Sequence, residues 1–381
     1  PRNRSSRPPY RLAGTLLEQD PMFGRVRIAL IAGIMTVTAC VSSQETPSRP
    51  APVIPPPKPV VRPAPKPPAP APSQAPAALA RAIHSLWAGF DGRVGIAIIR
   101  ADGNWIIHER GDELMPQQSV SKLWVAMAVM DAIDQGQMRL DDHVTLTRAD
   151  LTVFNQPIAA SIGEGSFTTT IADLLDRQMR RSDNTANDFL MRKLGGPQAI
   201  RSFITAKGFG AIRFGPGEKL LQAKTAGLSW RPEYSYGPAF RVARSRLSSA
   251  ARTAAMDAYL ADPPDGAAPI AIGRALLRLK RGDLLSPSST RYLLNLMSTS
   301  RTGPQRLHGG VPPDWRFAHK TGTGQDFKGR TAGFNDVAIM TAPDGTYYAV
   351  VVMIAETGLL LPRRFELMQG ISATIAAAHQ H

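Results

Sequence analysis

The chain has 381 residues, enough for one large core or two modest ones, and its charged fraction of 20% is that of an ordinary globular protein. Its formal net charge is +15, of which residues 1–77 carry +7, so the remainder is only mildly basic. The sequence shows no basic stripe interleaved with aromatic residues, which argues against a nucleic-acid partner. The single cysteine excludes an internal disulfide.

The N-terminal region has the features of a bacterial lipoprotein signal peptide. Arg25 and Arg27 precede an apolar run, Ile28–Val37, which is too short to span a bilayer. The Val-Thr-Ala-Cys sequence that ends at Cys40 resembles a lipobox, in which the cysteine is lipidated. A plain secretory signal that contains a cysteine is the alternative. Lipidation would hold the chain on a membrane of the cell envelope, facing the periplasm.

Four segments are predicted along the chain. Residues 1–21 lack a globular pattern and are interpreted as upstream, non-native sequence, and residues 22–40 as the signal peptide. Residues 41–77 form a proline-rich linker with 14 prolines in its last 33 residues. Such a composition cannot form a packed core and favours a semi-rigid spacer. Residues 78–381 form the globular domain.

The globular segment has strand patterns at its two ends and helix patterns between them. Arg93–Arg100 and Asn104–His108 flank Ala101-Asp102-Gly103, which predicts a β-hairpin. Apolar spacing and end signals then predict six helices, at about 119–136, 171–180, 185–194, 197–208, 269–281 and 287–298. Three strands and a final helix follow, at Arg316–Thr321, Phe334–Thr341, Thr346–Ile354 and Arg363–Ala378.

This order of elements implies an α/β fold. Residues of about 78–118 and 300–381 would form an antiparallel sheet built from both ends of the domain and flanked by helices. Residues of about 119–299 would form an all-helical part. Residues 223–262 look like an insertion in it, and their aromatic side chains predict an ordered segment that lines a groove.

The first of three chemical motifs is Ser119-Val-Ser-Lys122, at the start of a predicted helix. The Ser119 hydroxyl would lie near the positive end of the helix dipole, where a developing anion is favoured. Lys122 returns to the same helix face and can accept the hydroxyl proton if its neighbours depress its pKa. A capping serine followed by a solvated lysine is the alternative.

The other two motifs are Ser182-Asp183-Asn184 and Lys320-Thr321-Gly322. Between two predicted helices, Ser182 can relay a proton to a leaving amine and the Asn184 amide can hold a carbonyl. Plain capping of the following helix is the alternative. The third motif ends a strand in small residues, so a ligand can approach closely and Lys320 and Thr321 can receive a carboxylate. A strand that runs into a glycine loop is the alternative.

The three motifs, in this order and spacing, resemble those of the penicillin-recognising serine enzymes, and among them the class A β-lactamases. The resemblance covers the chain from about Leu79 to Ala378. It implies a site in the groove between the two parts of the fold. It also implies that Ser119 is the nucleophile, Lys122 the general base for acylation and Ser182 the proton shuttle.

The same resemblance implies the substrate-binding residues. Asn184 would bind the amide of the acyl side chain, and Lys320, Thr321 and the neighbouring Gly322 the substrate carboxylate. The backbone N–H groups of Ser119 and Thr323 would form the oxyanion hole. No cofactor or metal is expected.

One further carboxylate separates the two activities that such a site supports. Glu218 lies at the distance after Ser182 at which class A enzymes carry the glutamate that activates water against the acyl-serine, and Leu221 also matches that loop. The alternative is a solvent-exposed loop glutamate. The resemblance therefore implies a serine β-lactamase, active on β-lactam antibiotics as a monomer. A D-alanyl-D-alanine carboxypeptidase that acts on peptidoglycan peptides, or a non-catalytic peptidoglycan-binding lipoprotein, is the alternative.

Several residues depart from the family pattern. Gln222 stands where asparagine is usual, Asp188 where an asparagine supports the glutamate loop, and Pro216-Gly217 replace an arginine–aromatic pair. Phe334 replaces a residue that is often polar. The arginine that binds the substrate carboxylate must therefore come from elsewhere, and Arg330 is the candidate.

Overall fold

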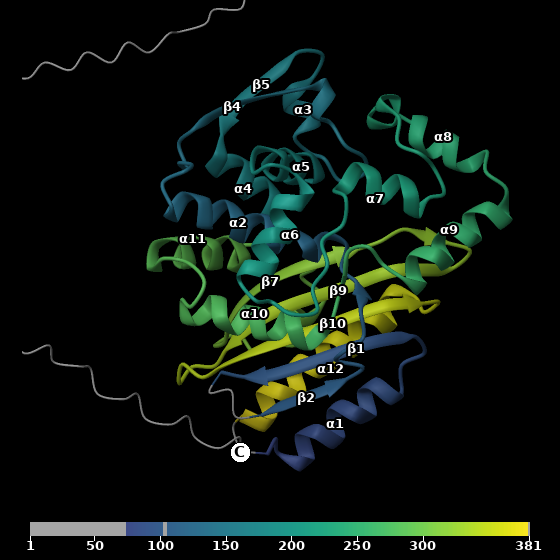
Figure 1. Cartoon of the computed structure of the whole chain (residues 1–381). Helices are drawn as coiled ribbons and strands as arrows, with labels where there is room; N and C mark the ends of the chain where they lie inside the picture. Colours follow the sequence, from purple (N-terminus) through teal and green to yellow (C-terminus); the bar gives the residue numbers. More distant parts are fainter. Residues whose placement is uncertain (1–73, 102–104, 380–381) are drawn as a thin grey trace, which may run out of the picture. The chain divides into compact units, whose positions relative to one another are not determined.

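The computed structural model describes residues 74–101 and 105–379. The predicted signal peptide, Cys40 and residues 41–73 of the linker lie outside this part of the chain. The strands of the main sheet are β1 (Arg93–Arg100), β2 (Ile106–Glu109), β7 (Arg316–Thr323), β8 (Asp326–Phe327), β9 (Arg330–Thr341) and β10 (Tyr347–Thr357). They form a six-stranded antiparallel sheet in the order β2-β1-β10-β9-β7, with β8 paired to β9 (Figure 1).

Strands from both ends of the domain lie side by side in this sheet. β1 pairs with β10, from Val94 opposite Ile354 to Arg100 opposite Tyr348. It also pairs with β2, which confirms the predicted hairpin. β9 lies between β10 and β7. The predicted sheet of N- and C-terminal strands is therefore confirmed.

Both faces of the sheet are covered, because alternate residues of a strand point to opposite faces. Val350 and Val352 of β10 pack in one cluster, with residues of α1 (Ala77–Ala88) and α12 (Leu361–His379). Val351 of β10 packs in the larger cluster on the other face. Burial on both faces explains why this strand reads as a nearly unbroken apolar run.

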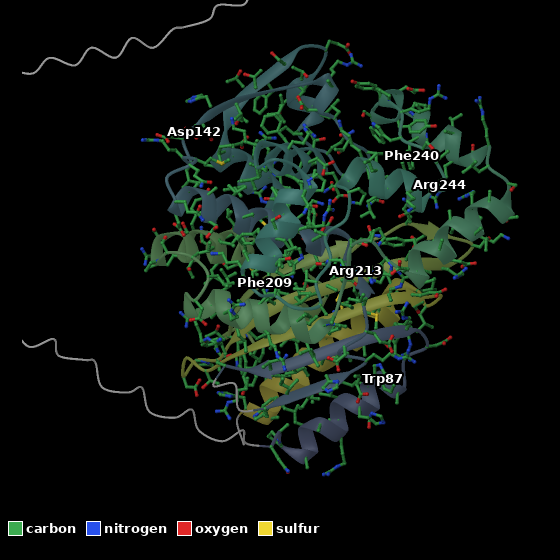
Figure 2. All side chains as sticks on the ribbon, viewed as in Figure 1. Trp87, Asp142, Phe209, Arg213, Phe240 and Arg244 are labelled. Carbon is green, nitrogen blue, oxygen red and sulfur yellow. The ribbon has the colours of Figure 1, made fainter. Side chains whose placement is uncertain are left out.

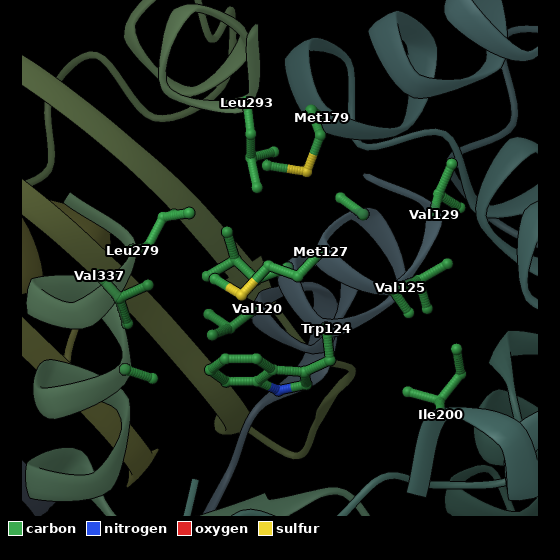
Figure 3. Packing of buried hydrophobic residues seen from close by; sticks show 14 of the residues in the cluster. Val120, Trp124, Val125, Met127, Val129, Met179, Ile200, Leu279, Leu293 and Val337 are labelled. Atoms are coloured by element: carbon green, nitrogen blue, oxygen red, sulfur yellow. The ribbon is translucent and has the colours of Figure 1, made fainter. Parts of the chain in front are cut away.

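The helical part is organised around α2 (Lys122–Asp134), a helix that is buried over most of its length. It contacts α4 (Ile171–Arg180), α5 (Asn184–Lys193), α6 (Pro197–Ala206) and α11 (Pro287–Ser298). Figure 3 shows Trp124 and Met127 of α2 among side chains from these neighbours. A helix that is apolar around its whole circumference is one that lies inside a core. α2 therefore holds its first turn in a fixed position.

Helices with strong end signals begin and end where the sequence predicts. α4 is capped by the Thr170 hydroxyl, which accepts a hydrogen bond from the Asp173 N–H. α10 (Pro269–Arg281) begins with a proline and ends at Gly282, which has a φ of +82° that a residue with a side chain rarely adopts. α10 packs on β1, β9 and β10, so this member of the predicted helical part covers the sheet.

Three features of the fold were not predicted. One is α1, and another is a two-stranded antiparallel sheet inside the helical part, made of β4 (His143–Thr147) and β5 (Ser166–Thr170). The third is the structure of residues 223–262, which comprise the end of α7 (Glu218–Thr225), η3 (Pro232–Ser235), α8 (Ala239–Ser245) and α9 (Ser249–Ala261). The remaining short elements are β3 (Met115–Pro116), η1 (Gln118–Ser121), η2 (Arg148–Asp150), α3 (Ala159–Ile162), β6 (Gly266–Ala267) and η4 (Leu307–Gly310).

The inserted segment, residues 223–262, is packed through its aromatic side chains, in agreement with the expectation that it is ordered. Tyr234 lies edge-on to both Trp230 and Phe240. Tyr259 of α9 packs in a separate cluster with Ala332 of β9. Within residues 74–101 and 105–379, none of the helices has the length and apolar character that a membrane span requires.

Candidate active site

The three sequence motifs meet in a groove of about 620 Å³. Its lining includes Ser119, Ser182, Asn184, Glu218, Thr321 and Thr323. Lys122 and Lys320 are fully buried beneath this lining and reach it through their ammonium groups. The structure thus brings together the predicted site residues from four separate stretches of the chain.

Ser119 lies in η1, immediately before α2, and Lys122 lies directly beneath it. The Lys122 Nζ donates hydrogen bonds to Ser119 Oγ at 2.8 Å and to Asn184 Oδ1 at 2.9 Å. A third hydrogen bond joins the same ammonium to the Glu218 carboxylate. Because Lys122 is fully buried, the alternative of a solvated lysine beside a capping serine does not hold.

Glu218 is the first residue of α7 and is only 4% exposed, so it is not a solvent-exposed loop glutamate. Lys122 and Glu218 can exchange a proton directly, because no other group lies between the hydrogen-bonded ammonium and carboxylate. When Glu218 holds the proton, the Lys122 amine is free to take the proton of Ser119. The pair therefore places two groups that can accept a proton beside the Ser119 hydroxyl.

Two of the departures from the family pattern hold Glu218 in place. The Asp188 carboxylate accepts hydrogen bonds from the backbone N–H groups of Glu218, at 2.9 Å, and Lys219, at 3.3 Å. The Gln222 amide donates to Glu218 Oε2 at 3.3 Å and to Gln118 Oε1 at 3.0 Å. Burial and the nearby Glu218 raise the pKa of Asp188. The unusual loop therefore still fixes the glutamate against Lys122.

Ser182 is held in a strained conformation at the opposite wall. Its φ is +58°, which is rare for a residue with a side chain. The Asn155 amide fixes this turn by donating to the Ser182 carbonyl at 2.9 Å. Lys320 Nζ donates to Ser182 Oγ at 3.0 Å. Burial, reinforced by Lys122 and Arg306, lowers the pKa of Lys320 well below its usual value, so Lys320 gives up a proton more readily than an exposed lysine.

The remaining motif residues divide between capping and binding. Asp183 caps α5 through a 2.9 Å hydrogen bond from the Ala186 N–H, so capping is the function of Asp183 and not of Ser182. The Asn184 amide donates to the Val153 carbonyl at 2.8 Å. Because an amide nitrogen carries two hydrogens, one remains for a ligand carbonyl in the groove.

Gly322 allows the third motif to lie against the turn that precedes Ser119. A Cβ atom at this position would stand 2.4 Å from the Gln117 carbonyl oxygen, which is closer than real Cβ contacts come. The Asn335 amide secures the same turn, donating to the Pro116 and Gln117 carbonyls at 2.7 and 3.0 Å. The close approach of β7 places Thr323, at its end, in the same groove lining as Ser119.

The prediction of Arg330 as the carboxylate-binding arginine is not supported by its position. Arg330 forms ion pairs with Asp257 and Glu356 at 2.8 and 2.5 Å and does not line the groove. Arg306 does line it, and its guanidinium donates to Thr323 Oγ1 at 2.6 Å. Burial lowers the pKa of Arg306 to about 10, which leaves it cationic at neutral pH.

The sequence indicated Arg306 only indirectly, through Phe334. Its guanidinium stacks on the ring of Phe334 at 3.8 Å, and Phe334 is the residue that departs from the usual polar side chain. An aromatic ring beside the third motif is a suitable surface for an arginine. Nothing in the sequence around Arg306 itself marks it.

A buried hydrogen-bonded network beside Ser119 was also not predicted from the sequence. The Gln118 side-chain amide donates to the Tyr259 hydroxyl at 2.6 Å, and its backbone N–H donates to Asp265 Oδ2 at 2.8 Å. Tyr259 also donates to Asp265 Oδ2 at 3.2 Å, while Asp265 Oδ1 has no hydrogen-bond partner among the described residues. The inserted segment is thereby connected to the residue that precedes Ser119.

Asp265 makes the stability of the protein depend on pH. Burial raises its pKa to about 6, against about 4 in an unfolded chain. The folded protein therefore binds more protons between these values, so this contribution is complete below pH 4 and is lost as the pH rises through 6. We expect wild type to lose about 3 kcal/mol relative to Asp265→Asn between pH 4 and pH 7, measured by guanidinium unfolding.

The matched control is Asp262→Asn, because the Asp262 side chain is 80% exposed. This variant should keep the wild-type profile of stability against pH. The same profile in all three proteins would show that Asp265 is not a buried carboxylate in the folded state.

The chain belongs to the class A β-lactamase family: the sequence profile of the Beta-lactamase enzyme family matches residues 78–379. β-Lactamase VEB-1 of Pseudomonas aeruginosa is 27% identical over 282 residues, which cover 73% of this chain and 83% of VEB-1. A β-lactamase of Streptomyces cellulosae is 30% identical over 273 residues, or 71% of this chain and 74% of the relative.

Solved structures agree with this assignment. A β-lactamase of Chitinophaga pinensis matches with a TM-score of 0.66 and 25% identity, over 79% of this chain and 99% of that one. An ancestral class A β-lactamase matches with a TM-score of 0.62 and 28% identity, over 79% and 99%. The family and the fold inferred from the motifs are therefore both confirmed.

Proposed function

We propose that the protein hydrolyses β-lactams through an acyl-serine intermediate on Ser119. The observation that carries this proposal is the contact of Lys122 with both Ser119 Oγ and the Glu218 carboxylate. Lys122, in its neutral form, takes the proton of Ser119 as Oγ bonds to the lactam carbonyl carbon. The N–H groups of Ser119 and Thr323 stabilise the oxyanion. Ser182 gives its proton to the ring nitrogen as the C–N bond breaks and is reprotonated from Lys320.

Hydrolysis of the acyl-serine completes the cycle. Glu218 first releases the proton that it took from Lys122, and Lys320 regains the proton that it gave to Ser182. Glu218 then accepts a proton from the attacking water, the water oxygen bonds to the acyl carbon, and the Ser119 ester bond breaks as Lys122 returns the Ser119 proton to Oγ. The buried position of Glu218 beside Lys122 favours this step over the single acylation that a peptidase of the same family would show toward a β-lactam. Arg306, Thr321 and Lys320 are the groups we assign to the substrate carboxylate.

A chromogenic cephalosporin tests the proposal directly. Purified wild type should turn it over repeatedly, and Ser119→Ala should not. A single acylation without turnover, together with release of D-alanine from a D-alanyl-D-alanine peptide, would favour the carboxypeptidase instead. Turnover that persists in Ser119→Ala would exclude Ser119 as the nucleophile.

The proposed setting is the periplasmic side of a bacterial membrane, with the monomer held by a lipid on Cys40 and spaced from the surface by the proline-rich linker. In a bacterial host we expect Cys40→Ser to move the protein from the membrane fraction to the soluble fraction, because the lipid-bearing thiol is absent. Intact mass should show added lipid on wild type only. A wild-type protein that is already soluble and carries no lipid mass would contradict the anchor.

A further inference from the structure

The inserted helix α8 adds an arginine to the end of the groove that lies away from Arg306. Arg244 lines the groove together with Ser119, and its Nη2 donates to the Asp326 carbonyl at 2.8 Å. Arg306 instead donates hydrogen bonds to the Gly322 carbonyl and the Thr323 hydroxyl. Asp326 lies three positions after Thr323, which in extended backbone is a rise of roughly 10 Å. The groove therefore has a cation at each end.

Arg244 forms no ion pair within the described part of the chain. The Nε atoms of Arg244 and Arg252 are both buried and have no hydrogen-bond partner among the described residues. The Arg252 guanidinium lies over the Phe327 ring at 3.9 Å, and neither arginine takes part in an ion pair there. Burial and the neighbouring Arg252 lower the pKa of Arg244, while Asp326 opposes this shift. The Asp326 carboxylate, which also lines the groove, accepts a hydrogen bond from the Thr331 hydroxyl and forms no ion pair with Arg244.

This arrangement differs from that of other arginines nearby. Arg231 pairs with Glu233 in the same inserted segment, and Arg330 pairs with Asp257 of α9. Two partly buried guanidinium groups that repel each other and form no ion pair are unfavourable in the free protein, although Asp326 offsets part of this repulsion. An anion bound beside the two guanidinium groups, at the groove, would offset their mutual repulsion.

An apolar wall lies beside the unpaired cation. Phe154 lines the groove, is 50% exposed and has a φ of +65°, so its ring is held in a strained position. It meets Phe240 of α8 edge-on, with 5.0 Å between ring centroids. Phe240 and Arg244, both labelled in Figure 2, are four residues apart and so lie on the same face of α8. α8 therefore supplies both Phe240, which supports the Phe154 ring, and the Arg244 guanidinium.

We propose that Arg244, with Arg252 behind it, forms a subsite that binds a carboxylate at the end of the substrate's acyl side chain. The proposal rests on the proposed function, since the acyl carbonyl must lie at Ser119 for its side chain to extend toward Asp326. A guanidinium matches the planar geometry of a carboxylate and binds it with two parallel hydrogen bonds. The preferred substrates are therefore β-lactams whose side chain is aromatic and ends in an acid.

The experiment compares two cephalosporins that share the nucleus, the C3 substituent and the aminothiazole-oxime side chain. One oxime carries a carboxyalkyl group and the other a methyl group. Dissociation constants are measured on the full chain in a Ser119→Ala background, which excludes chemistry. We expect the carboxylate compound to bind about tenfold more tightly, which is the size of one charge-assisted hydrogen bond.

Adding Arg244→Gln should bring the ratio of the two constants close to one, and adding Arg252→Gln should lower it. Adding Arg241→Gln, a change at an exposed arginine of the same helix, should leave the tenfold ratio unchanged. A ratio near one in the Ser119→Ala background, no binding of the carboxylate compound, or an unchanged ratio after Arg244→Gln would each overturn the subsite. Turnover of the chromogenic cephalosporin by wild type is read separately, so failure of the subsite and failure of the proposed function are distinguishable.

Discussion

Replacing Glu218 with glutamine should leave a long-lived acyl group on Ser119. The glutamine side chain has nearly the same shape but cannot accept a proton from water, so deacylation should slow by about 10²–10⁴-fold. Acylation should continue, because the substitution leaves the contact of Lys122 with Ser119 in place. Intact-mass spectrometry after mixing with a penicillin should show the adduct accumulate on the variant and disappear from wild type.

Glu233→Gln is the matched control, since Glu233 lies in the inserted segment with about half of its side chain exposed. It should clear the adduct at the wild-type rate. If wild type and Glu218→Gln hold the adduct for equal times, Glu218 takes no part in deacylation and the carboxypeptidase becomes the better assignment.

The position of Glu218 depends on contacts that replace those usual in the family. Asp188 binds the two backbone N–H groups at the start of α7, and Gln222 connects the carboxylate to Gln118. Gln118 is in turn bound by Tyr259 of the insertion. These residues form one buried hydrogen-bonded network, in which each polar group is held by at least two others. The insertion therefore contributes to the geometry of the site as well as to its outer wall.

Features that local sequence determines were predicted well. α4, α10 and α11 begin at a capping threonine or a proline, and these signals act within one helical turn. The Ser119–Lys122 pair is similar, since a spacing of three residues at a helix start places both side chains on one face. Only the buried state of Lys122 needed the structure.

Features that depend on distant partners could not be predicted. Arg306 reaches the site by stacking on Phe334, 28 residues later, and Tyr259 meets Gln118 across 141 residues. β4 does alternate buried Val144 and Leu146 with exposed residues, so its strand pattern was present and was overlooked. β5 is short and rich in threonine, and it forms by pairing with β4. Asp188 looked like a defect in the pattern because the backbone groups that it binds lie 30 residues away.

Lys122→Met should reduce both activity and stability. The variant removes the amine that accepts the Ser119 proton, so labelling by a radioactive penicillin should slow by about 10²–10⁴-fold. It also leaves the buried Glu218 carboxylate without its cation. Removing one partner of a buried ion pair costs about 3–5 kcal/mol, because the other charge remains uncompensated. Guanidinium unfolding at pH 7 should show this loss, whereas Lys193→Met, at an exposed lysine, should change stability by less than about 0.5 kcal/mol.

The double variant Lys122→Met/Glu218→Gln separates charge from packing. With both charges removed, no uncompensated carboxylate remains, so the double variant should be more stable than Lys122→Met alone although it carries one more substitution. Guanidinium unfolding at pH 7 measures this advantage. Penicillin labelling should stay slow in both, since neither has an amine beneath Ser119. Additive losses of stability would show that the two side chains are not an electrostatic pair, and would remove the basis for the proton exchange between them.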